Sequence, residues 1–266
     1  MTQELNIRIV RAPSFHGDRS WNYRGTMHPY NTLYFVTGGD GHIRLNGVVT
    51  DMLSGYVYLI PPHVRHDIWC DTQVDKVYVD VHVELMPGYD VFSDTNEILV
   101  QHIGLERCEW MQALSVGGIR ERLMLRGEVN LVLAGFMQKD PEPVSAGMAA
   151  FRPMITYMQR NLSARLRISE LAARFGWSPS VLSRSFKRVF GCGVKQYVEK
   201  LLTARLTEEL LLTDKTLQQI ADEYGFCDGY YLSAYFKRCM GVSPLIYRER
   251  QKSEKLPRSG TADHNL

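Results

Sequence analysis

Nearly the same seven residues occur twice in the second half of this chain. LSRSFKR occupies residues 182–188, and LSAYFKR occupies residues 232–238. The match extends further, because residues 171–191 align with residues 220–241, with one extra residue in the second copy after its glycine. A duplicated stretch of this length predicts two copies of one structural unit. Any fold of this part of the chain must therefore hold that unit twice.

Each copy predicts two short helices separated by a turn. The first helix ends at Gly176 in one copy and at Gly225 in the other, since glycine readily adopts the left-handed conformation that stops a helix. The second helix has an apolar face and a basic face. Two helices with a Gly-containing turn form a helix-turn-helix, whose second helix enters the major groove of DNA. An ordinary helical hairpin is the simpler interpretation of one such unit, but two units with the same basic face favour DNA binding.

The segment between the two copies predicts how far apart they lie. Residues 194–212 have apolar residues every three or four positions and no Gly or Pro, which predicts one helix of about 28 Å. This length approaches one turn of B-DNA, about 34 Å. Residues 1–150 hold 12 Lys and Arg against 18 Asp and Glu, whereas residues 151–266 hold 19 against 11. The basic half is therefore expected to bind double-stranded DNA.

Residues 225–248 resemble the signature of the AraC/XylS family of transcriptional regulators. The pattern in this chain is GF-x-D-x-x-Y-L-S-x-x-FKR-x-x-G-x-SP-x-x-Y-R. The resemblance covers residues 151–248 and implies a multidomain protein. Its C-terminal all-α domain, residues 149–250, would have two helix-turn-helix units joined by a linker helix. Residues 139–148 have the composition of an interdomain linker.

The resemblance also implies which residues of this chain contact DNA. The base-reading positions are Ser180, Ser183, Arg184, Gly229, Tyr230 and Ser233. The phosphate-contacting positions, near the ends of the two reading helices, are Lys187, Arg188, Lys237 and Arg238. Arg184 is the strongest base-reading candidate, because Arg donates two hydrogen bonds to guanine, worth about 1 to 3 kcal/mol of discrimination. The alternative for the four basic residues is a solvated charged face.

The first half of the chain has the pattern of an all-β domain. Residues 28–85 alternate short apolar runs with Gly, Pro and the hairpin signal Asn46-Gly47, which predicts a sandwich or barrel. Gly55, Pro61 and His66 keep the spacing of the second cupin motif, and the stretch resembles the small β-barrels of that family. The resemblance implies an N-terminal cupin-like barrel, residues 1–96, with a cavity for one small ligand.

The first cupin motif is represented only in part. Its metal-ligand positions, aligned by spacing, hold His28, Tyr30 and Tyr34. A neutral tyrosine is a poor substitute for a carboxylate ligand, so His28 and His66 are the ligands that survive. We therefore expect no metal, no cofactor and no enzyme activity. The alternative is a metal-dependent cupin enzyme with an accessory DNA-binding domain.

A row of polar side chains in residues 76–83 adds further candidates to the ligand-binding set. In KVYVDVHV, residues 76–83, the period of two places Tyr78, Asp80 and His82 on one face and four valines on the other. If the polar row faces the cavity, the ligand-binding set is His28, Tyr30, Tyr34, His66, Tyr78, Asp80 and His82. Carboxylate, imidazole and aromatic groups suit a polyhydroxylated effector such as a sugar. The alternative is that the polar row faces water.

The remaining segments complete the organisation. Residues 97–138 have helical spacing after Gly117-Gly118. In the family such helices often pair two chains, so a homodimer is expected; the alternative is that they pack on the barrel. Residues 251–266 predict a disordered tail.

No apolar run reaches the roughly 18 residues of a membrane span, and the N-terminus lacks a secretory pattern. These two features predict a cytoplasmic protein without a membrane partner.

Together these features predict a sequence-specific transcriptional regulator. Its C-terminal domain would read DNA through two helix-turn-helix units, and a small effector in its N-terminal barrel would change the arrangement of domains or dimer. For regulation to occur, the effector must bind the DNA-competent and DNA-incompetent arrangements with different affinities.

Overall fold

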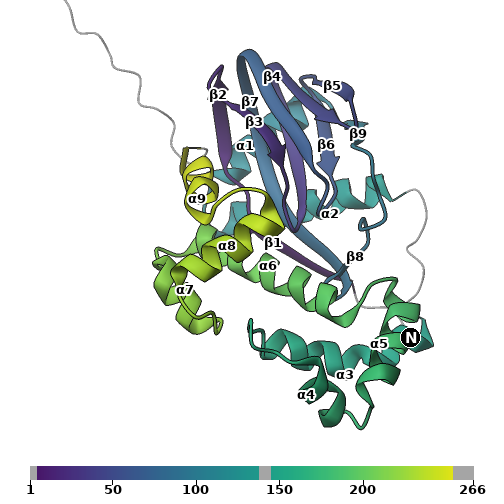
Figure 1. The fold of residues 1–266 in the computed structure, drawn as a ribbon. Coiled ribbons are helices and arrows are strands. Elements are labelled where there is room, and N and C mark those ends of the chain that lie inside the picture. The colour runs from purple at the N-terminus through teal and green to yellow at the C-terminus, as the bar shows by residue number, and fades with distance from the viewer. Residues whose placement is uncertain (1–4, 138–144, 254–266) are drawn as a thin grey trace, which may run out of the picture.

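The structure, a computed structural model, describes residues 5–137 and 145–253. Figure 1 shows an N-terminal region rich in strands and a C-terminal region of helices. The strands are β1 (Asn6–Arg11), β2 (Ser14–Asp18), β3 (Asn22–Thr26), β4 (Asn31–Leu45), β5 (Val48–Met52), β6 (Tyr56–Ile60), β7 (His66–Met86), β8 (Tyr89–Asp90) and β9 (Leu99–His102). The helices are α1 (Leu105–Ser115), α2 (Ile119–Phe136), α3 (Ala146–Arg160), α4 (Ile168–Arg174), α5 (Pro179–Phe190), α6 (Val194–Leu212), α7 (Leu217–Glu223), α8 (Gly229–Met240) and α9 (Pro244–Ser253).

Among the described residues, all the strands belong to one antiparallel sheet. Its main path is β1-β7-β4-β6-β9, with β2, β3 and β8 also pairing with β7, and β5 with β4. β4 pairs with β7 from Asn31↔Val81 to Arg44↔Asp67. The hairpin predicted at Asn46-Gly47 joins β4 to β5, and both residues have the positive φ, 52° and 82°, that such a tight turn requires.

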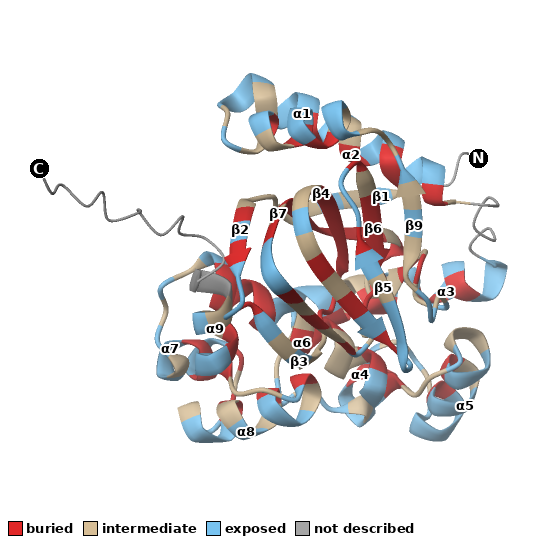
Figure 2. Cartoon of the chain, turned by 90° about the horizontal axis from the view of Figure 1, so that it is seen from above, coloured by how far each residue is buried: buried red, intermediate tan, exposed pale blue. Residues whose placement is uncertain are grey.

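The two faces of β7 are buried against different partners. Val77, Val79, Val81 and Val83 are fully buried and belong to the apolar cluster formed with α1 and α2. Tyr78, Asp80 and His82 are 2, 0 and 4% exposed on the other face. Figure 2 shows the sheet lying between α1 and α2 on one side and the C-terminal helices on the other. The alternative that this polar row faces water is therefore wrong.

The segment after residue 97 differs in part from the helical interpretation. Leu99–His102 forms β9, which pairs with β6, and its exposure alternates with a period of two. Four residues are too few for a helical period to be distinguished from this alternation. α1 and α2 follow and cover the valine face of β7. On α2, Val129 and Phe136 are buried in that cluster, whereas Ile119 and Leu123 are 79 and 66% exposed.

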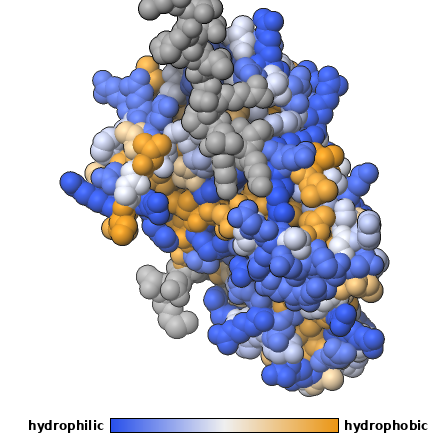
Figure 3. Space-filling model, turned by 90° about the vertical axis from the view of Figure 1, so that its left-hand side faces the viewer, coloured by the Kyte–Doolittle hydropathy of each residue, from blue (hydrophilic) through white to orange (hydrophobic). Residues whose placement is uncertain are grey.

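The C-terminal region contains two helix pairs, α4–α5 and α7–α8, which are joined by α6 and flanked by α3 and α9. α6 spans Val194–Leu212, the residues predicted for the connecting helix. Asp228 caps α8 by accepting a hydrogen bond from the backbone N–H of Tyr231. Gly191 and Gly241 end α5 and α8 in the left-handed conformation. Figure 3 shows the side of the molecule that carries α7 and α9 as mainly hydrophilic, with a few apolar patches.

Two sequence expectations at the ends of this region need correction. α3 begins at Ala146, inside the segment expected to be a linker, because Ser145 caps it by accepting a hydrogen bond from Met148 N. Residues 139–144 lie outside the described residues. α9 continues to Ser253, so residues 251–253 are helical rather than part of a disordered tail; the rest of that expected tail lies outside the described residues.

Candidate functional site

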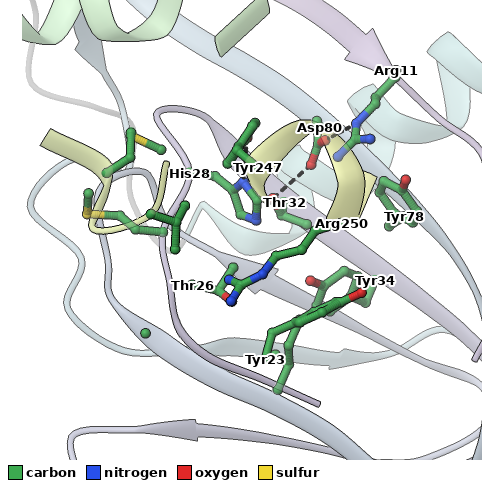
Figure 4. Close-up of a pocket in the computed structure, with 15 residues that line it drawn as sticks. Arg11, Tyr23, Thr26, His28, Thr32, Tyr34, Tyr78, Asp80, Tyr247 and Arg250 are labelled. Carbon is green, nitrogen blue, oxygen red and sulfur yellow. Dashed lines mark hydrogen bonds and ion pairs between the residues drawn. The ribbon is translucent and has the colours of Figure 1, made fainter. Parts of the chain in front are cut away.

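A small pocket lies where the sheet meets α8 and α9. We call it the interdomain pocket; it is lined by residues of β1, β3, β4 and β7, and by Met240, Tyr247 and Arg250 from the C-terminal region. Figure 4 shows Arg250 of α9 reaching into it toward Thr26 and Tyr23. The free volume is about 20 Å³, close to what one water molecule needs. The pocket therefore has no room for a small-molecule ligand in this arrangement, and we call this state closed.

A buried ion pair forms one wall of the interdomain pocket. Asp80 is fully buried and accepts hydrogen bonds from Arg11 Nε at 2.6 Å and from Thr32 Oγ1 at 2.8 Å. The Arg11 guanidinium also lies 4.7 Å from the centre of the Tyr78 ring. Buried charges need such partners, because an unpaired ion in the interior is strongly destabilising. The wall thus offers a carboxylate, a hydroxyl and an aromatic face to the pocket.

Tyr247 of α9 joins the C-terminal region to the sheet. Its side chain is 3% exposed, and its hydroxyl lies 3.1 Å from His28 Nδ1 and 2.9 Å from the Tyr30 hydroxyl. The rings of His28 and Tyr30 stack at 5.4 Å. Burial lowers the pKa of His28 to about 3 and raises the pKa of Tyr30 well above its usual range. Both groups are therefore neutral at physiological pH.

Glu208 makes a second polar contact between the two regions. This buried residue of α6 accepts hydrogen bonds from Arg8 Nη2 of β1 at 2.6 Å and from His82 Nε2 of β7 at 3.2 Å. Burial alone would raise the pKa of Glu208, but the hydrogen bonds from His82 and Arg8 outweigh it and lower the pKa to about 2. α6, which connects the two helix pairs, is thus attached to the sheet through an ionised carboxylate.

The predicted ligand-binding residues fall into two groups. His28, Tyr34, Tyr78 and Asp80 line the interdomain pocket. The others do not: Tyr30 and His82 bond to Tyr247 and Glu208, and the His66 ring lies 6.3 Å from that of His28, with Nδ1 3.1 Å from the Val64 carbonyl. The role of each of the seven residues in binding an effector stays a prediction.

Sequence reasoning missed Arg11, Thr32, Tyr247 and Arg250. Thr32 lies on the same face of β4 as Tyr34, so the period of two in residues 32–34 was a signal that could have found it. Arg11 belongs to a short strand with no marked pattern. Tyr247 and Arg250 enter the pocket from the other region of the chain, and nothing local in the sequence indicates such an approach.

Among residues 5–137 and 145–253, no three His, Cys, Asp or Glu side chains come together as metal ligands do. Nor does any helix in this part have the length and apolar character needed to cross a membrane.

The predicted DNA-contacting residues lie on α5 and α8. Ser180, Ser183 and Arg184 are exposed on α5, as are Lys187 and Arg188 near its end. On α8, Tyr230 is 90% exposed and Lys237 is also exposed, whereas Gly229 and Ser233 are half-buried. Arg238 differs from the other basic residues, because its Nη2 donates to Glu199 of α6 at 3.1 Å. Contact of these residues with DNA stays a prediction.

The chain is similar to a helix-turn-helix family and to named regulatory proteins. The family described as "Helix-turn-helix domain" matches residues 171–250. The Msm operon regulatory protein of Streptococcus mutans is 21% identical over 248 residues, which cover 87% of this chain and 88% of that protein. The HTH-type transcriptional activator RhaS of Mannheimia succiniciproducens is 24% identical over 236 residues, 83% of this chain and 87% of that protein.

A solved structure shows the same fold along most of the chain. Wild-type ToxT from Vibrio cholerae, bound to an unsaturated fatty acid, superposes with a TM-score of 0.59 at 12% identity, covering 93% of this chain and 97% of that one. The matched helices and the named relatives define a DNA-binding regulator of transcription. Within that class, the signature at residues 225–248 and the similarity to these relatives support an AraC family regulator.

Proposed function

We propose that this protein is a sequence-specific regulator of transcription whose action on DNA is controlled by a small effector in the interdomain pocket. The observation that carries this proposal is the composition of the pocket. Arg11, Thr32 and Asp80 come from the sheet, whereas Tyr247 and Arg250 come from α9. A ligand bound there touches both regions of the chain, so its binding free energy depends on how they are arranged.

The DNA-binding part of the proposal assigns both helix pairs as helix-turn-helix units. α5 and α8 would be the reading helices, with Arg184 as the principal base contact of the first unit. α6 would hold the two reading helices over successive segments of the major groove. The exposure of Arg184 and Tyr230 supports this assignment. The sheet of the N-terminal region would be a cupin-like barrel that has given up metal binding.

The closed state of the pocket supports a regulatory mechanism. Small-molecule sites ordinarily enclose about 300 to 1,000 Å³, far more than the roughly 20 Å³ present here. An effector therefore binds only after α9 or its neighbours move. Because the effector favours an arrangement different from this one, its binding shifts the population of arrangements, which is the physical requirement for control of DNA binding.

The groups around the pocket favour a polyhydroxylated effector such as a sugar. Asp80 and Thr32 offer hydrogen-bonding oxygens, and His28 offers a neutral imidazole. The rings of Tyr34 and Tyr78 offer apolar faces. Fatty-acid-bound ToxT supports a small-molecule ligand for a chain of this fold. This pocket, however, has more hydrogen-bonding groups than an acyl chain would use.

We also propose that α2 pairs two copies of the chain. Ile119, Leu123 and Leu131 are 79, 66 and 63% exposed, and with Gly127 between them they recur every four residues along one side of the helix. The substitution Leu123→Arg would place a charge in that interface. Light scattering after size-exclusion chromatography should then show a monomer where the parent protein is a dimer. A monomeric parent protein would contradict this part of the proposal.

In vitro selection of double-stranded DNA by the full-length protein tests the proposed function. The expected result is an enriched motif with two sub-sites whose centres lie about one helical turn apart. Sequence-independent binding that disappears with added salt would reflect phosphate contacts alone, and it would contradict sequence-specific regulation.

A further inference from the structure

The Tyr247 hydroxyl fills a hydrogen-bonding site formed by the connection between β3 and β4 at the edge of the sheet. The two groups that hold it, His28 and Tyr30, are 7 and 0% exposed. They occupy positions that correspond by spacing to the metal-ligand positions of the first cupin motif. What the sheet holds at these positions is a phenol that belongs to the other region of the same chain.

The chemistry of this site suits a neutral hydroxyl. His28 is neutral, so one ring nitrogen donates a hydrogen bond and the other accepts one. The Tyr30 hydroxyl both donates and accepts. An anion is favoured only if both groups donate to it, and a cation only if both accept from it. A hydroxyl needs neither condition, because the Tyr30 O–H can rotate so that the bound hydroxyl donates to one of the two groups and accepts from the other.

We propose that Tyr247 is a built-in occupant of the effector site. A hydroxyl-bearing effector, a sugar or related polyol, takes the place of the phenol between His28 and Tyr30 and thereby releases α9 from the sheet. This inference rests on the proposed function, and it adds the class of ligand, the position of one ligand hydroxyl and the contact that the ligand breaks.

The contacts of Tyr247 and its neighbour connect this exchange to the DNA-binding helices. The Tyr247 ring packs against Phe236 of α8, with centroids 5.5 Å apart. Arg248 donates to the Leu210 carbonyl of α6 at 3.2 Å and to the Lys215 carbonyl at 2.8 Å. Movement of α9 therefore disturbs both the second reading helix and the end of the connecting helix.

Arg250 gives α9 a second contact with the sheet. It lies three residues after Tyr247, so the two side chains leave the same face of the helix. The Arg250 guanidinium lies 4.9 Å from the centre of the Tyr23 ring of β3. α9 thus closes the interdomain pocket with two side chains, one hydrogen-bonded and one stacked.

Hydrogen exchange of the ligand-free protein tests whether Tyr247 holds α9 in place. Tyr247→Phe keeps the ring and removes the hydroxyl, so amide exchange in α9 is expected to become roughly ten times faster, the effect of losing one or two hydrogen bonds. Tyr58→Phe is the matched control. Tyr58 is equally buried, and its hydroxyl also has two hydrogen bonds, to Leu53 N and the Asp51 carbonyl, both within the N-terminal region. Equal exchange of α9 in Tyr247→Phe and the parent protein would overturn the inference.

A panel of monosaccharides tests the ligand class. Aldopentoses, aldohexoses, deoxyhexoses and hexuronic acids are each titrated and binding is measured by calorimetry. A sugar that binds the parent protein should bind Tyr247→Phe about three to ten times more tightly, because the competing phenol is weakened. Equal affinity for both proteins, or no binding by any sugar, would overturn the proposed ligand. DNA selection is a separate measurement, so its failure would remove the regulatory function and leave the exchange result standing.

Discussion

The two helix pairs share a sequence pattern but differ in what surrounds them. α5, the proposed first reading helix, carries Lys187 and Arg188 exposed at its end. The corresponding end of α8 lies against the sheet: Met240 lines the interdomain pocket, and Arg238 is paired with Glu199 of α6. The difference teaches that duplication of a unit does not imply duplication of its role. We expect the first pair to read DNA in every state, and the second pair to respond to the effector.

The largest effect is expected from breaking the contact between Glu208 and the sheet. Glu208→Ala leaves Nε2 of the buried His82 without its hydrogen-bond partner, so the free energy of unfolding should fall by roughly 2 kcal/mol. This is below the full cost of breaking a buried ion pair, because Arg8 is 46% exposed. Urea denaturation measures the change. The control is Glu170→Ala, which removes an exposed pair with Arg167 and should cost little. Equal losses of stability in the two variants would show that Glu208 contributes no more than a residue of an exposed ion pair.

Local patterns explain what the sequence predicted correctly. The residues of α6 and the hairpin at Asn46-Gly47 follow from periodicity and turn chemistry, which act within a few residues. The polar row at Tyr78 to His82 was found because side chains alternate along a strand. β9 was missed because four residues do not establish a period.

The contacts between the two regions could not be predicted in this way. Tyr247 belongs to the family signature, which describes the DNA-binding domain and carries no information about the sheet. Glu208 lies 126 positions from His82. No local sequence pattern distinguishes it from the other polar residues of α6. Such contacts depend on how the surface of the N-terminal region packs against that of the C-terminal region. The sequence therefore indicated only part of the interdomain pocket: it included His28, Tyr34, Tyr78 and Asp80 but not Arg11 and Thr32 of the sheet.

A second effect, similar in size, concerns base reading by the first helix pair. Arg184→Ala should relax preference at one position of the selected DNA site, by about 1 to 3 kcal/mol between the preferred base and the others. Competition binding with single-base variants of the site measures this. The control is Lys187→Ala, expected to weaken binding to every sequence alike. If Arg184→Ala also weakens all sequences equally, then Arg184 contacts phosphate.

Acid should lower the stability of the folded protein through its buried histidines. Burial lowers the pKa of His28 to about 3 and that of His66 to about 4, against 6.5 for an unfolded histidine. Because the unfolded chain binds more protons in this range, stability is fully present above pH 6.5 and is lost as the pH falls toward 4. The free energy of unfolding should be lower at pH 5.5 than at pH 7.5 by about 1 kcal/mol for each histidine.

One carboxyl group opposes this trend and must be separated from it. Burial raises the pKa of Asp90 to about 6, so its contribution to stability improves as the pH falls through that value. The His66→Asn variant keeps Asp90 and lacks one of the histidines, so its loss of stability on acidification should be smaller than that of the parent protein. A protein that gains stability between pH 7.5 and 5.5 would contradict the expected trend.

The smallest effect tests the difference between Arg188 and Arg238 directly. The Glu199 carboxylate accepts a hydrogen bond from Arg238, a residue predicted to contact a DNA phosphate. Glu199→Gln keeps the shape and removes the charge, so affinity for the selected DNA should rise about two- to fivefold. The gain is small because the pair is largely exposed, 65 and 36%.

Salt dependence distinguishes release of Arg238 from a general change in charge. If Arg238 gains a phosphate contact, the plot of log affinity against log salt should become steeper by about one unit. Glu170→Gln removes the same charge beside Arg167, which the family resemblance does not place on DNA, and should leave the slope unchanged. Equal slopes in both variants would mean that Arg238 gains no phosphate contact when Glu199 loses its charge, which would contradict the expected release of Arg238.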